Sequence, residues 1–199
     1  MKLYGAPQTR AIQAVWMLEE CGARYERVLV DIRGGAQHTP EYHAINPMEK
    51  VPALVDGEAR VAETGAICAY LADRFPEAEL APKVHEPERG RYLQWLFFAG
   101  SCIEPSILEK MLKLELNPSQ SGWGSHSKVL DVLEEAVSEG PWLLGDRFTA
   151  ADVVIGSGLN FGVRLFNIFD TRPAFDAYID RCVARPAFIR AQELADDWK

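Results

Sequence analysis

The sequence lacks the features that tie a protein to nucleic acid or to a membrane. It holds only 21 Lys and Arg against 29 Asp and Glu, a net charge of −8, and no run of basic residues. A protein that binds the phosphate backbone needs a basic surface for most of its affinity, so we exclude a nucleic-acid partner. The longest apolar stretches, such as residues 95–99, are far shorter than the roughly 20 residues of a membrane span. We therefore predict no membrane contact.

Cysteine is scarce, and its placement excludes two kinds of site. The four cysteines are far apart, with no Cys-x-x-Cys pair and no neighbouring histidine cluster: Cys21, Cys68, Cys102 and Cys182. Such spacing argues against a metal site and favours buried, reduced thiols. The N-terminus has no apolar signal-peptide core, because Met1-Lys-Leu-Tyr4 leads straight into a strand pattern. We expect a cytoplasmic protein.

Strand and helix patterns alternate over the first 75 residues. Four segments show the apolar alternation of β-strands: residues 2–4, 25–32, 52–55 and 59–62. Helical spacing occupies residues 12–21 and 64–75, with Gly22 as the stop of the first helix and Thr64 as the cap of the second. The turn Asp56-Gly57 offers the positive φ angles of a tight hairpin. The order is βαβ followed by ββα, with the first two strands parallel.

Helical periodicity fills the second half. The proline-rich residues 76–86 are typical of a linker. Every later pattern has helical spacing: residues 88–116, 127–138, 150–161 and two segments that begin at Pro173 and Pro186. The loop 117–124 between the first two of these helices is expected to expose Trp123. We predict an α/β domain near 1–75 and an all-α domain near 87–199.

Two motifs a short distance apart carry a family resemblance. They are Asn46-Pro-Met-Glu-Lys-Val-Pro52 and Glu63-Thr-Gly-Ala-Ile67. With a strand-first domain and a helical second half, the whole chain resembles the cytosolic glutathione transferase family. The resemblance implies a thioredoxin-like N-terminal domain that binds glutathione, an all-helical C-terminal domain and a homodimer.

For the Val51–Pro52 peptide bond, the residues alone and the family resemblance predict different isomers. Only about 5–6% of X-Pro bonds in folded proteins are cis, so the residues alone favour a trans proline that opens a strand. The resemblance implies cis, with the Val51 amide and carbonyl pairing with the backbone of glutathione.

Glu63 and Thr64 stand at a strand-to-helix junction, where free amides and the helix dipole favour an anion. The resemblance implies that Thr64 binds the γ-glutamyl carboxylate and Glu63 the ammonium group. The alternative is a helix cap next to a solvated charge. Lys50 and His38 lie in the loop that similar proteins use for the glycine carboxylate, although a lone loop histidine is usually only solvated.

The reaction needs a thiolate, and here the sequence departs from the family pattern. A free thiol has a pKa near 8.5, which a donor and the N-terminus of the first helix can lower. The position expected to hold a serine donor is Ala6. Two hydroxyls lie nearby: Thr9, at the opening of the helix, is the first choice, and Tyr4 is the second, unless it packs in the core. Backbone amides and the helix field acting alone are a third possibility.

The same turn reads Ala6-Pro-Gln-Thr9, so dithiol exchange by the protein's own cysteines is excluded. We predict a glutathione transferase that directs the thiolate at a small hydrophobic electrophile. Two alternatives stay open: a glutathione-dependent isomerase or reductase of a specific metabolite, and a binding or regulatory protein without catalysis. The second stays open because Ala6 stands where a serine donor is expected.

In the helical half, Thr149 and Asp152 have the spacing of a capping box, which indicates a role in stability. Aromatic residues at helical spacing usually pack in the core, and four are expected there: Trp95, Phe97, Phe98 and Trp142. Three residues of the long first helix are candidates to meet the electrophile: Ser101, Cys102 and Glu104.

Overall fold

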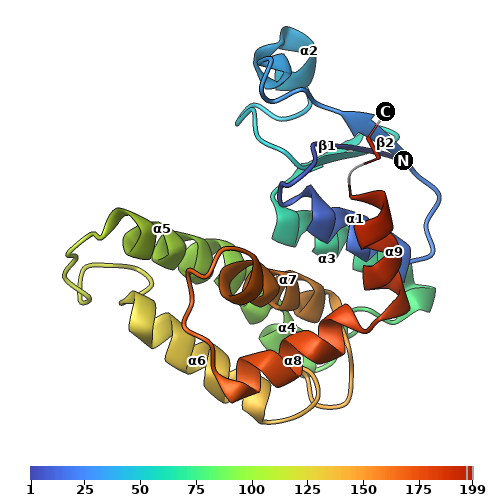
Figure 1. The fold of residues 1–199 in the computed structure, drawn as a ribbon. Helices are drawn as coiled ribbons and strands as arrows, with labels where there is room; N and C mark the ends of the chain where they lie inside the picture. Colours follow the sequence, from blue (N-terminus) through green and yellow to red (C-terminus); the bar gives the residue numbers. More distant parts are fainter. Residues whose placement is uncertain (196, 199) are drawn as a thin grey trace. The chain divides into compact units, whose positions relative to one another are not determined.

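The computed structural model describes residues 1–195 and 197–198. It divides the chain into two compact units (Figure 1). Unit 1 comprises residues 1–80 together with the segment from Ala184 onward, and unit 2 comprises residues 81–183. Among the described residues, no helix is long and apolar enough to cross a membrane.

Unit 1 is built on a four-stranded sheet with the order β2-β1-β3-β4. The strands are β1 (Lys2–Gly5), β2 (Glu26–Leu29), β3 (Ala53–Asp56) and β4 (Ala59–Ala62). β1 and β2 are parallel, whereas β1–β3 and β3–β4 are antiparallel. The predicted βαβ–ββα order and the thioredoxin-like class are confirmed. In the hairpin turn only Gly57 has a positive φ, of 61°, because Asp56 still belongs to β3.

Helices cover both faces of this sheet. One side carries α1 (Ala11–Glu20), α3 (Thr64–Arg74) and α9 (Pro186–Leu194), and the other carries the short α2 (Pro40–His43) (Figure 1). α1 stops where Gly22 takes a φ of 59°, as predicted. The segment that follows β2 contains the 3₁₀ helix η1 (Ala36–His38) and α2, and the linker region holds the 3₁₀ helix η2 (Pro76–Ala78). Each is a single turn, too short to show a helical period in the sequence.

The last helix belongs to unit 1, whereas the predicted all-α domain ran from 87 to 199. The rings of Trp16 in α1 and Phe188 in α9 meet edge to face at 4.9 Å. Arg185 binds the Glu20 carboxylate through two nitrogens, at 2.6 and 2.8 Å, and only 8% of the Glu20 side chain is exposed. A local pattern predicts a helix but not which partner helix it packs on, so the division between units differs from the one drawn on sequence.

Unit 2 is helical throughout its described elements. They are α4 (Glu88–Phe98), the π-helix η3 (Ala99–Ile103), α5 (Glu104–Leu112), α6 (His126–Ser138), α7 (Ala150–Leu159), the π-helix η4 (Asn160–Leu165) and α8 (Pro173–Val183). The predicted continuous helix 88–116 is wrong in two places. Pro105 has no amide hydrogen and its ring crowds the Ser101 carbonyl one turn earlier, so the ladder widens into η3. The helix then ends at Lys113, which takes a left-handed φ of 52°.

The capping box of α7 is confirmed and lies in the core of unit 2. Thr149 accepts a hydrogen bond from the Ala151 amide, and Asp152 accepts from the Thr149 amide at 2.9 Å. Asp152 also accepts from the Leu143 amide at 2.9 Å and from the Tyr178 hydroxyl at 2.8 Å. Burial raises the pKa of Asp152. The box joins the start of α7 to the preceding loop and to α8.

Not every aromatic residue expected in the core lies there. Trp95 is buried, but Phe97 is 73% exposed because it falls on the opposite side of α4. Phe98 and Trp142 are half-buried, and Trp123 is also half-buried, since its indole donates to Glu109 Oε2 at 2.6 Å. All four cysteines are free, as predicted; three are buried, and Cys102 in η3 is half-exposed.

Candidate functional site

Three segments of unit 1 meet at one end of the sheet. The register pairs Tyr4 with Ala53 and Ala53 with Ala62. The end of β1, the start of β3 and the end of β4 therefore lie side by side, and the residues just beyond them share that edge. These are the turn 6–10, the dipeptide Val51–Pro52 and the junction Glu63–Thr64. The sequence predicted a site from these same segments, and the sheet brings them together.

The Val51–Pro52 bond is cis, as the resemblance implies. The loop before it is held by α2: Tyr42 Oη donates to the Lys50 carbonyl at 2.6 Å, and Asn46 Nδ2 donates to the same oxygen at 2.8 Å. The Asn46 side-chain oxygen in turn accepts from the Met48 amide at 3.1 Å. Val51 precedes β3 and lies outside its register. The buried side chains of Tyr42 and Asn46 thus fix the backbone immediately before the cis bond.

The start of α3 differs from the prediction that Thr64 caps it. Glu63 is the N-cap, with φ 64° and ψ 122°, and its side chain makes no capping hydrogen bond. Thr64 is the first helical residue, where a hydroxyl no longer reaches the amides of the next turn from outside. Glu63 is exposed and Thr64 half-buried. A helix of 11 residues thus begins without a side-chain cap, which is the geometry that favours an anionic ligand.

A histidine pair sits on the loop next to Lys50. His38 Nδ1 lies 2.5 Å from Glu49 Oε2, and His43 Nδ1 lies 3.0 Å from Glu49 Oε1. These two hydrogen bonds lower the pKa of Glu49. Glu49 takes a left-handed φ of 57°, and no sequence pattern marks this conformation. Sequence reasoning therefore did not identify Glu49 or His43 as part of this cluster. Lys50 is exposed, and no ion pair to it occurs in the described part of the chain.

The turn after β1 uses Thr9 internally. Thr9 Oγ1 donates to the Ala6 carbonyl at 2.7 Å and accepts from the Ala11 amide at 3.2 Å, so its hydroxyl is used within the turn before α1, whose N-cap is Arg10. Ala6 itself is 5% exposed and offers no side-chain donor. Tyr4 is half-buried on the α2 side of the sheet, in a cluster with Val30, Tyr42 and Ala53, and its ring meets that of Tyr42 edge to face at 6.1 Å.

The two thiols of unit 1, Cys21 and Cys68, lie away from this turn. Cys21 is at the opposite end of α1, and burial raises its pKa to about 12. Burial likewise raises the pKa of Cys68 in α3. Among the described residues, no group of three or more His, Cys, Asp or Glu is arranged to hold a metal ion. Neither cysteine of unit 1 can therefore serve as the thiol at this turn.

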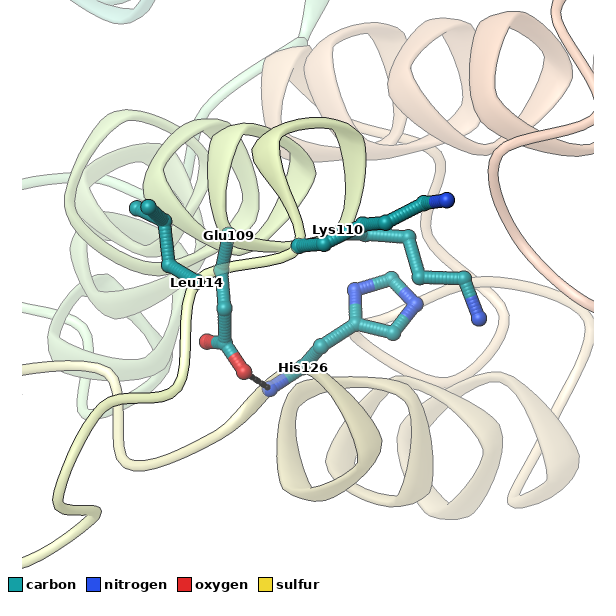
Figure 2. A pocket seen from close by; sticks show the side chains of 5 residues that line it. Glu109, Lys110, Leu114 and His126 are labelled. Atoms are coloured by element: carbon teal, nitrogen blue, oxygen red, sulfur yellow. Dashed lines mark hydrogen bonds between the residues drawn. The ribbon is translucent and has the colours of Figure 1, made fainter.

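Unit 2 supplies the remaining candidates. Ser101 and Cys102 lie in the π-helix η3, and Glu104 opens α5. Ser101 donates to the Phe97 carbonyl at 2.8 Å. A cavity of about 370 Å³ near the other end of α5 is lined by Glu109, Lys110, Lys113, Leu114 and His126 (Figure 2). In it the Glu109 carboxylate accepts from the His126 amide, which closes the start of α6 to other anions.

Comparison with known proteins covers both halves of the chain. The family model for the glutathione S-transferase N-terminal domain matches residues 1–73, and the C-terminal domain model matches residues 123–186. Glutathione S-transferase F10 of Arabidopsis thaliana is 35% identical over 154 residues, 71% of each chain. The disulfide-bond oxidoreductase YfcG of Escherichia coli is 28% identical over 198 residues, 93% of this chain and 91% of that one.

A solved structure agrees with these matches. The glutathione S-transferase of a sphingomonad, complexed with glutathione, superposes with a TM-score of 0.81 at 26% identity over 98% of both chains. Its likeness spans the sheet of unit 1 and the helices of unit 2. The chain belongs to the glutathione S-transferase family.

Proposed function

We propose that the protein binds glutathione along the sheet edge of unit 1 and transfers it to an apolar electrophile. The observation that carries this proposal is the shared edge formed by the turn 6–10, the cis Val51–Pro52 bond and the uncapped start of α3. Each part suits a different part of the tripeptide. A neighbouring structure of the same family holds glutathione.

The tripeptide carries carboxylates at both ends and an ammonium group at one of them, and the sheet edge offers partners of opposite charge for each. The free amides of α3 and the Thr64 hydroxyl suit the γ-glutamyl carboxylate, and the exposed Glu63 carboxylate suits the ammonium group. The Val51 backbone pairs with the cysteinyl part as an added strand does. Lys50 and His38 suit the glycine carboxylate at the other end.

The reaction depends on the ionised sulfur. With both ends held, the sulfur lies at the opening turn of α1, where the helix field favours a thiolate. Thr9 is the proposed side-chain donor and Tyr4 the weaker candidate. The thiolate attacks a small hydrophobic electrophile, forms a carbon–sulfur bond and displaces a leaving group such as halide. Supplying thiolate and proximity requires no general base on the protein. We further propose a cytoplasmic homodimer.

Calorimetry with reduced glutathione and a conjugation assay with 1-chloro-2,4-dinitrobenzene test the proposal together. Glu63→Gln should weaken glutathione binding about 10- to 100-fold, because it removes a charged partner of the ammonium group. Glu58→Gln is the matched control, since Glu58 lies in the β3–β4 turn at the opposite end of the hairpin. Heat without turnover would favour the non-catalytic alternative. No heat with the wild-type protein would reject the glutathione site itself.

A second candidate is the reduction of disulfides with glutathione, which the likeness to YfcG favours. No cysteine of this chain lies at the turn, so two glutathione molecules must supply the electrons. The thiolate of the first attacks one sulfur of a substrate disulfide and releases a thiol. The second attacks the mixed disulfide, which gives the other substrate thiol and oxidised glutathione. Turnover of 2-hydroxyethyl disulfide without conjugation of the aryl halide would favour this reaction over transfer.

A further inference from the structure

The end of β1 contains a slot that another part of the chain fills. Gly5, the last residue of β1, has no side chain, and a β-carbon there would come within 2.3 Å of Trp198 Cη2 and 2.8 Å of Ala11 Cβ. The indole of Trp198 therefore lies directly against the Gly5 backbone, beside the first residue of α1. Any larger residue at position 5 would displace it.

One hydrogen bond holds this indole, and two more anchor the residues before it. Trp198 Nε1 donates to the Ala195 carbonyl at 2.8 Å, which folds the tail back just after α9. Arg27 of β2 donates to the Leu194 carbonyl at 2.6 Å and to Asp197 Oδ2 at 3.0 Å. The Arg27 side chain is 15% exposed, whereas that of Asp197 is 57% exposed. Both acceptors precede Trp198 in the chain, so Arg27 ties the residues just before the indole to β2.

The slot adjoins the turn that is proposed to hold the glutathione sulfur. Gly5 is followed directly by Ala6, whose carbonyl accepts from Thr9, and the Ala11 amide donates to the Thr9 hydroxyl. The indole lies against Gly5, the residue that enters the turn, and Ala11 lies within reach of the same point. The two ends of glutathione, in contrast, are assigned to Lys50, Glu63 and Thr64, none of which touches the tail in the contacts of the described chain.

We propose that Trp198 is a positioning residue for the thiolate: its indole supports the β1–α1 turn from beneath and fixes where the amides and the Thr9 hydroxyl point. This inference rests on the proposed function. Because the ends of glutathione are held elsewhere, loss of the indole changes the position of the donors around the sulfur and leaves binding of the tripeptide nearly intact. The expected signature is a lower kcat with an unchanged KM for glutathione.

Paired aromatic-to-leucine variants of the full chain test the proposal. Trp198→Leu should lower kcat for 1-chloro-2,4-dinitrobenzene about tenfold and move its pH profile upward, because small displacements of a reacting group are costly. Phe188→Leu is the control: Phe188 packs on Trp16 in the same unit and does not adjoin the turn. Trp198→Phe keeps a ring in the slot and should restore most of the rate. Equal losses of kcat in Trp198→Leu and Phe188→Leu would overturn the proposal, since general destabilisation would then explain both.

Hydrogen exchange gives a readout that does not require turnover. Trp198→Leu should speed exchange of the amides in residues 5–11 more than Phe188→Leu does, whether or not glutathione is present. Unchanged protection of these amides would overturn the proposal even if kcat falls. A wild-type protein that neither binds nor turns over glutathione, but shows the exchange effect, would reject the proposed function while leaving the support of the turn by Trp198 standing.

Discussion

Replacement of Thr9 by valine tests the proposed donor at nearly constant side-chain volume. The Thr9 hydroxyl has one proton, which it gives to the Ala6 carbonyl at 2.7 Å, and it accepts from the Ala11 amide at 3.2 Å. To donate to a bound thiolate, the hydroxyl must turn away from Ala6. The gain at the sulfur is therefore a difference between two hydrogen bonds.

The size of that difference can be estimated. A hydrogen bond to a charged acceptor contributes about 1.5–3 kcal/mol and a neutral one about 0.5–1.5 kcal/mol, so the net preference for the thiolate is about 1–1.5 kcal/mol. One pKa unit corresponds to about 1.4 kcal/mol, so Thr9→Val should raise the pKa of bound glutathione by about one unit. Below that pKa the conjugation rate should fall about tenfold, and at higher pH it should recover.

The assay is kcat/KM for an aromatic halide between about pH 5.5 and about pH 9. Thr9→Ser, which keeps a hydroxyl, should follow the wild-type profile. Loss of the two Thr9 hydrogen bonds in the turn also costs about 1 kcal/mol of stability. Ser125→Ala serves as the control, because it removes the side-chain cap of α6 in unit 2 at a similar cost. An unshifted profile for Thr9→Val would refute the argument and leave the backbone amides and the helix field as the source of thiolate stabilisation.

Three further predictions concern binding and stability. Thr64→Val should weaken glutathione binding by about 1.5–3 kcal/mol in calorimetry, because the carboxylate loses a donor; an unchanged affinity would place the carboxylate elsewhere. Glu49 has a lowered pKa, so its contribution to stability is present above the ordinary glutamate pKa and disappears as the pH falls through the lowered value. The melting temperatures of Glu49→Gln and wild type should therefore differ near neutral pH and converge once the pH falls below the lowered pKa of Glu49, and a constant gap would argue against the histidine pairing. Asp152→Ala should cost about 3–5 kcal/mol in urea unfolding, because buried donors of Leu143, Thr149 and Tyr178 lose their acceptor; a loss below about 1 kcal/mol would contradict this.

The sequence predicted those parts of the fold that local patterns determine. Alternation located the four strands, and the parallel first pair followed from the length of the segment between them. The spacing of Thr149 and Asp152 predicted a capping box because both partners lie within one helical turn. The site at the edge of the sheet was predicted from the family resemblance and not from local patterns, and the register brings the ends of β1 and β4 and the start of β3 together there.

Features that depend on backbone conformation at single residues were not predictable. Glu63 and Glu49 both take positive φ angles, which glutamate rarely adopts, so no pattern marked Glu63 as the N-cap or Glu49 as the partner of two histidines. The π-helix before Pro105 was also not predicted. The helical spacing of apolar residues continues across it, so the sequence pattern does not show that the backbone hydrogen bonds widen there. Packing between distant segments, such as α9 on α1, has no local signal at all.

The proposed site recognises its ligand mainly through backbone groups, and this explains where its critical side chains lie. Ala6 offers no donor, Val51 would act through its amide and carbonyl, and α3 would act through its uncapped amides. In a site of this kind the position of the backbone affects function, so the residues that fix the backbone matter as well as those that line the edge. Tyr42, Asn46, Thr9 and Trp198 each hold a segment of the edge from behind. Substitutions there should reduce activity even though three of the four would never touch the ligand.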